Sequence, residues 1–438
     1  MTGRCQWHIA GMMGLMIVGL GTVGALAQNQ NPRLAVSDQQ EGMVRVIDTT
    51  DGSVIAEFPL PGPASQLHTT ESGRYAGVVI GDDIDQVHFL DSGVMLVPHL
   101  DHAHAELEAP NLLPLQLSGA AAGTANPSHF VSHASQIAVH FDGSASDGVP
   151  AAAYVLNEAD LLGDAPSVVV ITTAAHHGVA EPIAGGGIVW TDADPEGEFD
   201  TLPSGFTVRD TSGNILQTFN NKAGEPHEFC LGMHGSAVVG SHFIFGCHQA
   251  DTGVLILSQG GDGAFTSRKV LYPEPFRRTS VIAAHPALSF AVGQYGQFGD
   301  NNYYTSLIRI DPEAESIPFR NVLALSDVQC GFAFEQAQGE VLFVVTQDGY
   351  VHLYHPNHSG EGVATPWLHL GSLKVTEAEF ACTGGFAVGQ GHAYVTRPEQ
   401  GDVLEISLMD ITQTRSLPVP GVPGQVAVFG WWQALGAM

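Results

Sequence analysis

A run of ten residues, His-Leu-Asp-His-Ala-His-Ala-Glu-Leu-Glu, places three histidines and three carboxylates between His99 and Glu108. In an extended segment alternate side chains share one face, so His102 and His104 can turn toward one ion while Asp101 adds charge or orients a ring. Neutral imidazole with carboxylate suits Zn²⁺ first, with Cu²⁺ and Ni²⁺ as competitors. We therefore expect a metal site on this segment. A merely acidic, polar surface tether is the alternative.

A second set of histidines stands in a short pattern in which glycine follows histidine. The segments that begin at His177 and His234 read His-Gly-Val-Ala and His-Gly-Ser-Ala, and they superpose residue for residue. A glycine in the second place lets two backbones approach each other closely. The candidate metal ligands of this set are His129, His176, His177, His234 and His248.

Residues 1–27 have the layout of a secretory signal peptide. Arg4 precedes an apolar run from Ile9 to Leu20, and Ala25-Leu26-Ala27 offers a small-residue cleavage site. The run is too short for a membrane helix, and no later stretch is apolar enough to span a bilayer. We expect a mature domain of residues 28–438 that is exported to the periplasm and has no membrane span.

Four cysteines remain in that mature domain, and an even number in an oxidising compartment favours two disulfides. The expected pairs join Cys230 to Cys247 and Cys330 to Cys382. Reduced buried cysteines or thiolate zinc ligands are the alternatives, although no Cys-x-x-Cys spacing supports zinc thiolates. The first bridge would hold His234 and His248 at one rim of the fold.

Composition excludes whole classes of partner. The formal charge is −30, with only 15 Lys and Arg, so no basic stripe for nucleic acid or for an anionic membrane can be built. The 21 histidines outnumber the Lys and Arg together, which acidic solubility alone does not explain.

Short alternating strands that end in a turn residue recur along the whole chain. Eight such anchors follow one another at intervals of 43 to 66 residues: Asp48, Asp91, Asn157, Asp210, Ser258, Asp311, His355 and Asp410. Units of about 40 to 50 residues with several strands each are typical of β-propeller blades. We predict an all-β fold made of one propeller with eight blades, or seven if the weak anchors Ser258 and His355 are irregular connections. A C-terminal strand near 424–430 would close it against strands at 34–60.

The one oversized interval, from Asp91 to Asn157, contains the histidine run. It predicts an inserted loop at about 94–115, and loops of this size are usually functional or disordered. In a propeller, the His-Gly segments would begin the innermost strands of neighbouring blades, so His177, His234 and His129 should converge near the central channel. We therefore expect His102 and His104 to close over zinc held there.

These residues resemble the AztD-type periplasmic zinc chaperones, β-propeller proteins that hand zinc to the solute-binding protein of a zinc ABC transporter. The resemblance covers the mature chain through Asp101-His102-Ala103-His104, His176-His177-Gly178, His234-Gly235 and the segment 225–230. It implies zinc binding at two sites and direct transfer to that partner. It does not assign each histidine to a site.

Two other functions remain open from the sequence alone. A three-histidine site with an open position could activate water in a metal-dependent hydrolase or lyase, with Glu181 or Glu225 as a base. Against this, the chain has no Gly-x-Ser-x-Gly elbow, no His-Glu-x-x-His helix and no phosphate loop. A protein-interaction scaffold with incidental histidines is the second alternative. We expect a non-enzymatic monomer, since a closed propeller leaves no open sheet edge.

Overall fold

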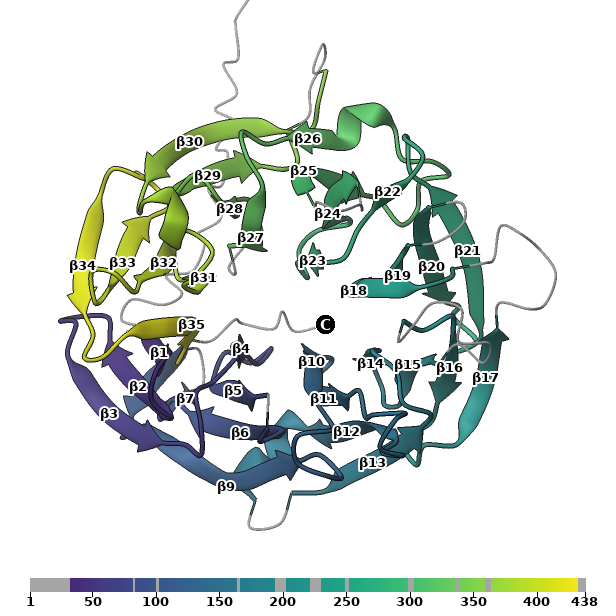
Figure 1. Ribbon diagram of the computed structural model, residues 1–438, viewed down its shortest axis with the longest axis horizontal. Helices are drawn as coiled ribbons and strands as arrows, with labels where there is room; N and C mark the ends of the chain where they lie inside the picture. The colour runs from purple at the N-terminus through teal and green to yellow at the C-terminus, as the bar shows by residue number, and fades with distance from the viewer. Residues whose placement is uncertain are drawn as a thin grey trace, which may run out of the picture.

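Eight antiparallel sheets surround a central axis as the blades of a β-propeller (Figure 1). The computed structural model describes residues 32–81, 83–99, 102–163, 166–193, 202–220, 230–248, 252–297, 303–335, 339–358 and 364–431. The expected signal peptide at 1–27 lies outside these ranges. Among the described residues, no helix has the length and apolar character needed to cross a membrane.

The first blade combines both ends of the chain, as the sequence predicts. Its order from the rim inward is β3 (Val54–Pro59), β2 (Met43–Asp48), β1 (Arg33–Asp38) and β35 (Pro423–Phe429). Strand β35 pairs antiparallel with β1, so the last strand of the chain becomes the innermost strand of the first blade. This pairing closes the ring, so that each blade is left with only short inner and outer edge strands.

The next three blades each run from an innermost to an outermost strand. The second has β4 (Gln66–Thr69), β5 (Tyr75–Ile80), β6 (Gln86–Asp91) and β9 (Asn111–Ser118). The third has β10 (Pro127–His133), β11 (Gln136–Phe141), β12 (Ala151–Asn157) and β13 (Val168–Thr173), and a short 3-10 helix, η1 (Glu158–Leu162), follows β12. The fourth has β14 (Ala180–Pro182), β15 (Ile188–Asp192), β16 (Gly205–Arg209) and β17 (Ile215–Asn220).

The remaining four blades repeat the arrangement. The fifth has β18 (Met233–Val239), β19 (His242–Cys247), β20 (Gly253–Gln259) and β21 (Phe265–Leu271). The sixth has β22 (Arg277–Arg278), β23 (Ile282–Ala284), β24 (Ala291–Gln297), β25 (Tyr303–Ile310), η2 (Phe319–Asn321) and β26 (Val322–Ala324). The seventh has β27 (Gln329–Phe334), β28 (Leu342–Thr346), β29 (Tyr350–His355) and β30 (Leu368–Lys374). The eighth has η3 (Ala378–Phe380), β31 (Phe386–Gly389), β32 (His392–Arg397), β33 (Asp402–Ser407) and β34 (Thr414–Pro418).

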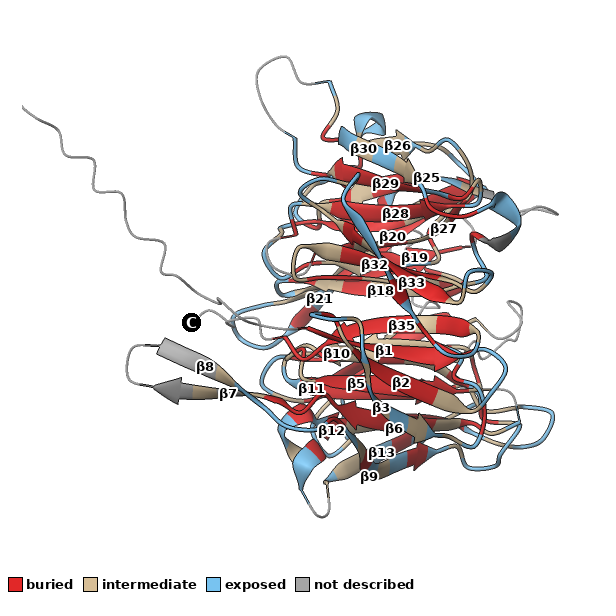
Figure 2. Cartoon of the chain, turned by 90° about the vertical axis from the view of Figure 1, so that its left-hand side faces the viewer, coloured by how far each residue is buried: buried red, intermediate tan, exposed pale blue. Residues whose placement is uncertain are grey.

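The core lies between neighbouring blades rather than in one central mass. Aromatic side chains such as Phe89 of the second blade and Phe141 of the third pack in one cluster, and both are almost fully buried. The outermost strands alternate between exposed and half-buried positions, as in β3, because only one of their faces meets a neighbouring blade. Figure 2 shows the buried inner strands between more exposed rims.

The two ends of the propeller need names. Because the innermost strands share one direction, they all begin at one end, the start face, and end at the other, the hairpin face. The hairpin is the two-stranded sheet of β7 (Val94–His99) and β8 (His102–Leu107), inserted between β6 and β9, and it projects from the propeller (Figure 2).

The hairpin replaces the loop expected at about 94–115. Outer strand β9 begins at Asn111, so the residues after it belong to the blade and not to the insertion. At the hairpin base, the Arg33 guanidinium donates to the carbonyls of Ser92 and Glu108, the latter at 2.8 Å. The first described strand therefore holds the base of the hairpin in place.

Candidate metal centre

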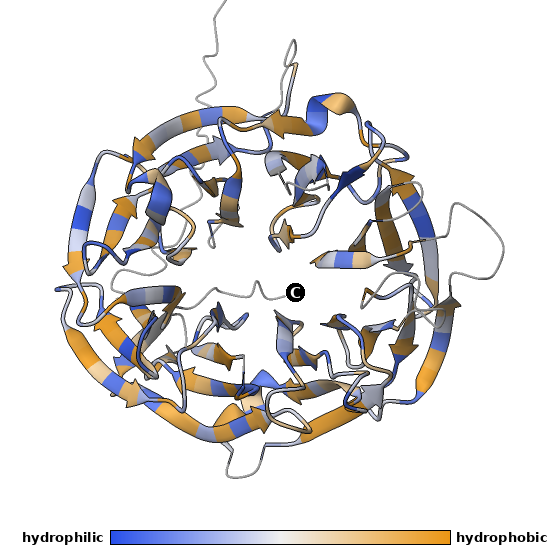
Figure 3. Cartoon of the chain, viewed as in Figure 1, coloured by the Kyte–Doolittle hydropathy of each residue, from blue (hydrophilic) through white to orange (hydrophobic). Residues whose placement is uncertain are grey.

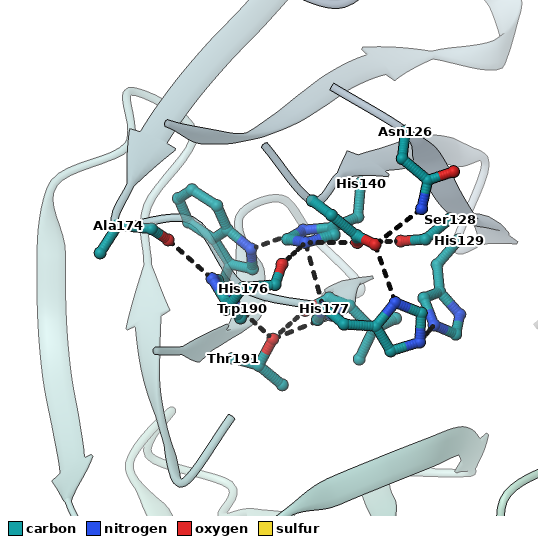
Figure 4. Close-up of polar contacts among 12 residues, drawn as sticks. Asn126, Ser128, His129, His140, Ala174, His176, His177, Trp190 and Thr191 are labelled. Atoms are coloured by element: carbon teal, nitrogen blue, oxygen red, sulfur yellow. Dashed lines mark hydrogen bonds and ion pairs between the residues drawn. The ribbon is translucent and has the colours of Figure 1, made fainter. Parts of the chain in front are cut away.

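Three consecutive blades each bring one histidine to the start face near the axis. His129 lies near the beginning of innermost strand β10, and His177 lies shortly before β14 (Figure 4). His234 lies near the beginning of β18. The Nε2 atom of His177 lies 3.4 Å from Nε2 of His129 and 3.1 Å from Nε2 of His234. One ring nitrogen of each histidine lies within 4.8 Å of the other two. We call these three residues the histidine cluster.

The nitrogen separations match those that a tetrahedral zinc site requires. With Zn–N bonds of about 2.0 to 2.1 Å, two ligand nitrogens of a tetrahedron lie roughly 3.3 Å apart. The two Nε2 separations of 3.1 and 3.4 Å bracket this value. The donor set of three imidazoles suits Zn²⁺, and it leaves a fourth position for water or for an incoming ligand.

Asp142, which follows β11, orients the central histidine of the cluster. Its Oδ2 accepts from His177 Nδ1 at 2.9 Å and from Asn126 Nδ2 at 2.8 Å, and its Oδ1 accepts from the Ser128 hydroxyl. A proton held on Nδ1 leaves the lone pair of His177 on Nε2, which faces the cluster. This carboxylate–histidine pair is the arrangement that commonly supports a metal-binding imidazole.

The electrostatics of the cluster favour neutral imidazole, the form that binds metal. Burial lowers the pKa of His129 to about 3, with His177, His140 and His234 adding to the effect. Burial also lowers the pKa of His234 to about 4, again with His177 nearby. Burial opposes ionisation of Asp142, but the hydrogen bonds from His177 and Ser128 outweigh it and hold its pKa below the usual value. The site therefore keeps two imidazoles neutral beside an ionised carboxylate at neutral pH.

The glycines that follow His177 and His234 are needed for packing. A Cβ atom on Gly178 would lie 2.2 Å from Thr191 Oγ1 and 2.3 Å from His176 Nε2. Gly235 has a φ of +77°, and a Cβ there would lie 2.6 Å from the Ser280 carbonyl oxygen. Glycine is the residue that tolerates both the close approach and the left-handed backbone.

His176 points away from the cluster and into the space between blades. Its Nδ1 donates to the Ala174 carbonyl at 2.9 Å, and its Nε2 lies 3.1 Å from the Thr191 hydroxyl. Both nitrogens are therefore engaged within the fold, and burial lowers the pKa of the ring. The structure does not bring His176 together with the histidine cluster, because neighbouring side chains of an extended segment point to opposite sides.

His140 forms a buried support beside Asp142. Trp190 Nε1 donates to His140 Nδ1 at 3.1 Å (Figure 4). The other ring nitrogen, Nε2, lies 3.1 Å from the His176 carbonyl oxygen and 3.2 Å from the backbone nitrogen of Gly178. The His140 Nε2 atom is also 3.5 Å from Asp142 Oδ1. The ring is fully buried, and burial lowers its pKa to about 3.

His248 lies behind His234, with their ring centroids 5.3 Å apart. Its Nε2 donates to the Thr279 carbonyl at 3.2 Å, so the lone pair resides on Nδ1. The preceding residue, Cys247, forms a disulfide with Cys230, and a second disulfide joins Cys330 to Cys382, as the sequence predicts. His248 therefore borders the histidine cluster but is not one of the three residues whose ring nitrogens converge.

The hairpin histidines lie at the opposite end of the propeller from the cluster. In the hairpin, His102 pairs with His99 and His104 with Val97, whereas Asp101 lies outside the described residues. The hairpin leaves from the end of β6, which runs parallel to innermost strand β4, and so it rises from the hairpin face. The expectation that His102 and His104 close over the clustered histidines is therefore wrong. Because β6 ends at the hairpin face, the hairpin histidines and the clustered histidines lie at opposite ends of the propeller.

Sequence reasoning missed Asp142 and His140. One signal could have found the carboxylate: Asp142 follows the second strand of its blade as His248 follows the second strand of another. Residues in that position lie at the start face beside the innermost strand. His140 is recognisable only once β11 is seen to pack against the fourth blade.

Comparison with known proteins adds an independent observation. The search against protein-family models finds no match. The zinc chaperone AztD of Citrobacter koseri is 28% identical over 424 residues, which cover 95% of this chain and 91% of that protein. The chain is similar to AztD over nearly its whole length. The resemblance seen in the sequence is thereby confirmed.

Solved AztD structures agree with the eight-bladed architecture. The structure of apo AztD from C. koseri superposes with a TM-score of 0.74 at 26% identity, covering 92% of this chain and 98% of that one. A second crystal structure of C. koseri AztD gives the same TM-score and covers 93% of this chain and 100% of that one. Sqt1 from Chaetomium thermophilum, at 14% identity and a TM-score of 0.54, shares the fold alone. Similarity to AztD therefore extends over essentially the whole propeller.

Proposed function

We propose that this protein is a periplasmic zinc chaperone that binds Zn²⁺ through His129, His177 and His234 and delivers it to the solute-binding protein of a zinc ABC transporter. The observation that carries the proposal is the convergence of three imidazoles, with the Nε2 atom of His177 at separations from Nε2 of His129 and of His234 that suit tetrahedral zinc. The whole-length similarity to the zinc chaperone AztD supports the same conclusion.

The geometry suits a carrier that must also release its ion. Three imidazoles bind zinc firmly, and the fourth position can accept a ligand from an acceptor before the first protein ligand leaves. The cluster lies at a face of the propeller and not in its core, and the His177 side chain is 27% exposed. An incoming ligand can therefore reach the ion without unfolding of the blades.

We assign the hairpin a separate zinc site. His102 and His104 occur in the hairpin with Asp101 close in sequence, and the chemistry of this donor set suits zinc as well. Because the hairpin rises from the other face, this site would load and release zinc independently of the histidine cluster. The proposed zinc sites lie at opposite ends of the propeller because β6 ends at the hairpin face, whereas the innermost strands begin at the start face.

A carrier fits the pocket beside the cluster better than an enzyme does. The pocket is lined by His129, His177, Val179, Met233, His234 and Phe245, and the part that described residues form has a free volume of about 10 Å³. This is room for about one water molecule, whereas pockets for organic ligands usually measure about 300 to 1,000 Å³. The space admits an ion with its water, which supports a non-enzymatic role.

The disulfides support the assigned compartment. Two cystine bridges persist in oxidising surroundings, and a cleavable leader at 1–27 would deliver the chain there. The closed ring needs no second copy to cover a sheet edge, so we propose a monomer.

A transfer experiment tests the function. Zinc-loaded protein is mixed with a metal-free zinc solute-binding protein, and zinc is measured on each after separation. We expect transfer faster than spontaneous release to a dilute chelator, and its loss in His177→Gln. The control His369→Gln changes an exposed histidine of outer strand β30 and should behave as the wild type. A wild-type protein that holds no zinc, or never passes it on, would refute the proposal.

A further inference from the structure

The connection between the fifth and sixth blades packs directly on the histidine cluster. This segment, residues 271–281, runs from the end of β21 through β22 to the beginning of β23. His248 Nε2 donates to the Thr279 carbonyl, and the backbone of Gly235 lies against Ser280 and Val281. We call it the 271–281 segment. It forms part of the rim around the cluster.

The strand register places the whole segment at the start face. Leu271, the last residue of β21, pairs with Gly253, which in turn pairs with Cys247 beside the beginning of β18. Arg277 pairs with Gln297 at the end of β24, which is the same end of the sixth blade. The segment is therefore next to the clustered histidines and far from the hairpin.

Three large apolar side chains of this one segment are exposed. The exposed fractions are 73% for Phe276, 47% for Leu271 and 46% for Val281. Scattered single apolar residues are normal on a surface, but several on one short connection beside a functional site indicate a contact surface. An exposed phenylalanine is also the kind of side chain that anchors an interface.

Phe276 is presented in an unfavourable backbone conformation. Its φ is +62°, in the left-handed region that bulky residues seldom adopt. Such strain persists only where the surroundings impose it, and it gathers at functional sites. Glycine would suit this position better, yet the chain has a phenylalanine there, with its ring in solvent.

The charge of this region is opposite to that of the protein. The 271–281 segment contains two basic residues, Arg277 and Arg278, and one acidic residue, Glu274, in a chain of net charge −30. Arg277 is held by Glu274 at 3.3 Å and lies over the Tyr295 ring. Figure 3 shows β22 as a strongly hydrophilic strand. An acidic partner is repelled by the rest of the surface and attracted here.

We propose that the 271–281 segment is the docking surface for the protein that receives zinc, and that this acceptor has an acidic surface with an apolar depression next to its own metal site. This inference rests on the proposed chaperone function and deepens it. Arg277 and Arg278 orient the acceptor as it approaches, and Phe276 anchors it. Docking here holds the acceptor's ligands beside the open fourth position of the cluster.

The chain offers a matched pair of variants to test this surface. The test variant is Phe276→Gly with Arg277→Gln. The control is Phe319→Gly with Arg320→Gln, which changes the same residue pair in η2, where Phe319 is 64% exposed before outer strand β26. Because glycine relieves the positive φ at 276, the test variant should unfold at a temperature no lower than that of the wild type.

Two acceptors separate docking from metal release. Zinc-loaded protein is mixed with an apo zinc solute-binding protein or with a small fluorescent zinc chelator, which needs no docking. We expect the test variant to transfer zinc to the protein acceptor about tenfold more slowly at low salt, with a weaker salt dependence. Its rate to the chelator and its zinc affinity should stay within twofold of the wild type, and the control should match the wild type throughout.

Three results would overturn the docking surface or the chaperone function. An unchanged rate to the protein acceptor would overturn the docking surface while leaving the chaperone function intact. Equal slowing toward both acceptors would overturn it too, because the segment would then act on the zinc site itself. A wild type that delivers zinc to the protein no faster than to the chelator would instead remove the chaperone function on which the inference rests.

Discussion

Replacing Asp142 with asparagine should weaken zinc binding and should also weaken the apo fold. The Asp142 carboxylate accepts three hydrogen bonds, which are donated by His177 Nδ1, Asn126 Nδ2 and the Ser128 hydroxyl. Asparagine has one acceptor oxygen where aspartate has two, so its amide group must face one of these donors. The orientation of His177 is then less strictly held, and the negative charge behind it is lost.

The size of the effect follows from the geometry. With 2.9 Å from the carboxylate to Nδ1 and a Zn–N bond of about 2 Å, the Asp142 carboxylate would lie roughly 6 to 7 Å from the ion. Attraction between a single negative charge and Zn²⁺ at that distance is about 1.3 kcal/mol even at the dielectric constant of water, and larger in a protein. This energy corresponds to about a tenfold loss of zinc affinity, which is the lower end of the 10- to 100-fold range for residues that support a metal ligand.

Competition titration against a chelator of known affinity measures this prediction. Asp147→Asn is the matched control, since it removes the same charge from an exposed position in the turn that follows Asp142, and it should alter affinity by less than twofold. The apo form of Asp142→Asn should unfold at a lower temperature than the wild type at neutral pH, because the fold lowers the pKa of Asp142 and so favours the carboxylate that the variant lacks. Wild-type zinc affinity in Asp142→Asn would refute the role given to the carboxylate.

Three further predictions concern the rest of the molecule. Deleting residues 94–107 should remove one zinc equivalent and leave the affinity of the cluster within twofold, as metal titration would show, because the hairpin rises from the other face. Burial lowers the folded pKa of both His140 and His248 to about 3, below the unfolded value of about 6.5, so the unfolded chain binds more protons in acid. Apo stability should therefore fall as the pH drops below 6.5, by about 1.4 kcal/mol per group at pH 5.5, and denaturant titrations at pH 7.5 and 5.5 would measure the loss. Replacing Cys230 and Cys247 by serine should cost about 3 kcal/mol for a loop of 17 residues and should also weaken zinc binding, whereas equal affinity would show that the bridge does not position His234.

Much of the architecture could be read from the sequence because a local pattern repeats. All eight anchors fall at or just after the third strand from the axis in their blades, such as Asp48 at the end of β2 and Asp311 just after β25. Alternating apolar residues and a polar turn residue are local properties, so the sequence displays them directly. Even the weak anchors, Ser258 and His355, lie in strands β20 and β29, which decides for eight blades over seven.

The candidate site was only partly readable, for reasons of geometry. His177 and His234 stand out through the glycine that follows each, a requirement of local packing. Asp142 does not, because its importance comes from a contact between two blades. The position of the hairpin was misjudged because its distance in sequence from the cluster says nothing of which face it leaves. That depends on the direction of β6, which the antiparallel order of the blade determines.

A crystal structure of the zinc-loaded protein, with anomalous data collected at the zinc absorption edge, tests the central claim most directly. The account predicts a zinc peak about 2.0 to 2.1 Å from the Nε2 atoms of His129, His177 and His234, with Asp142 still bound to His177 Nδ1. The same peak should be absent from His177→Gln. Zinc bound only at the hairpin, with nothing between the three clustered rings, would contradict the account.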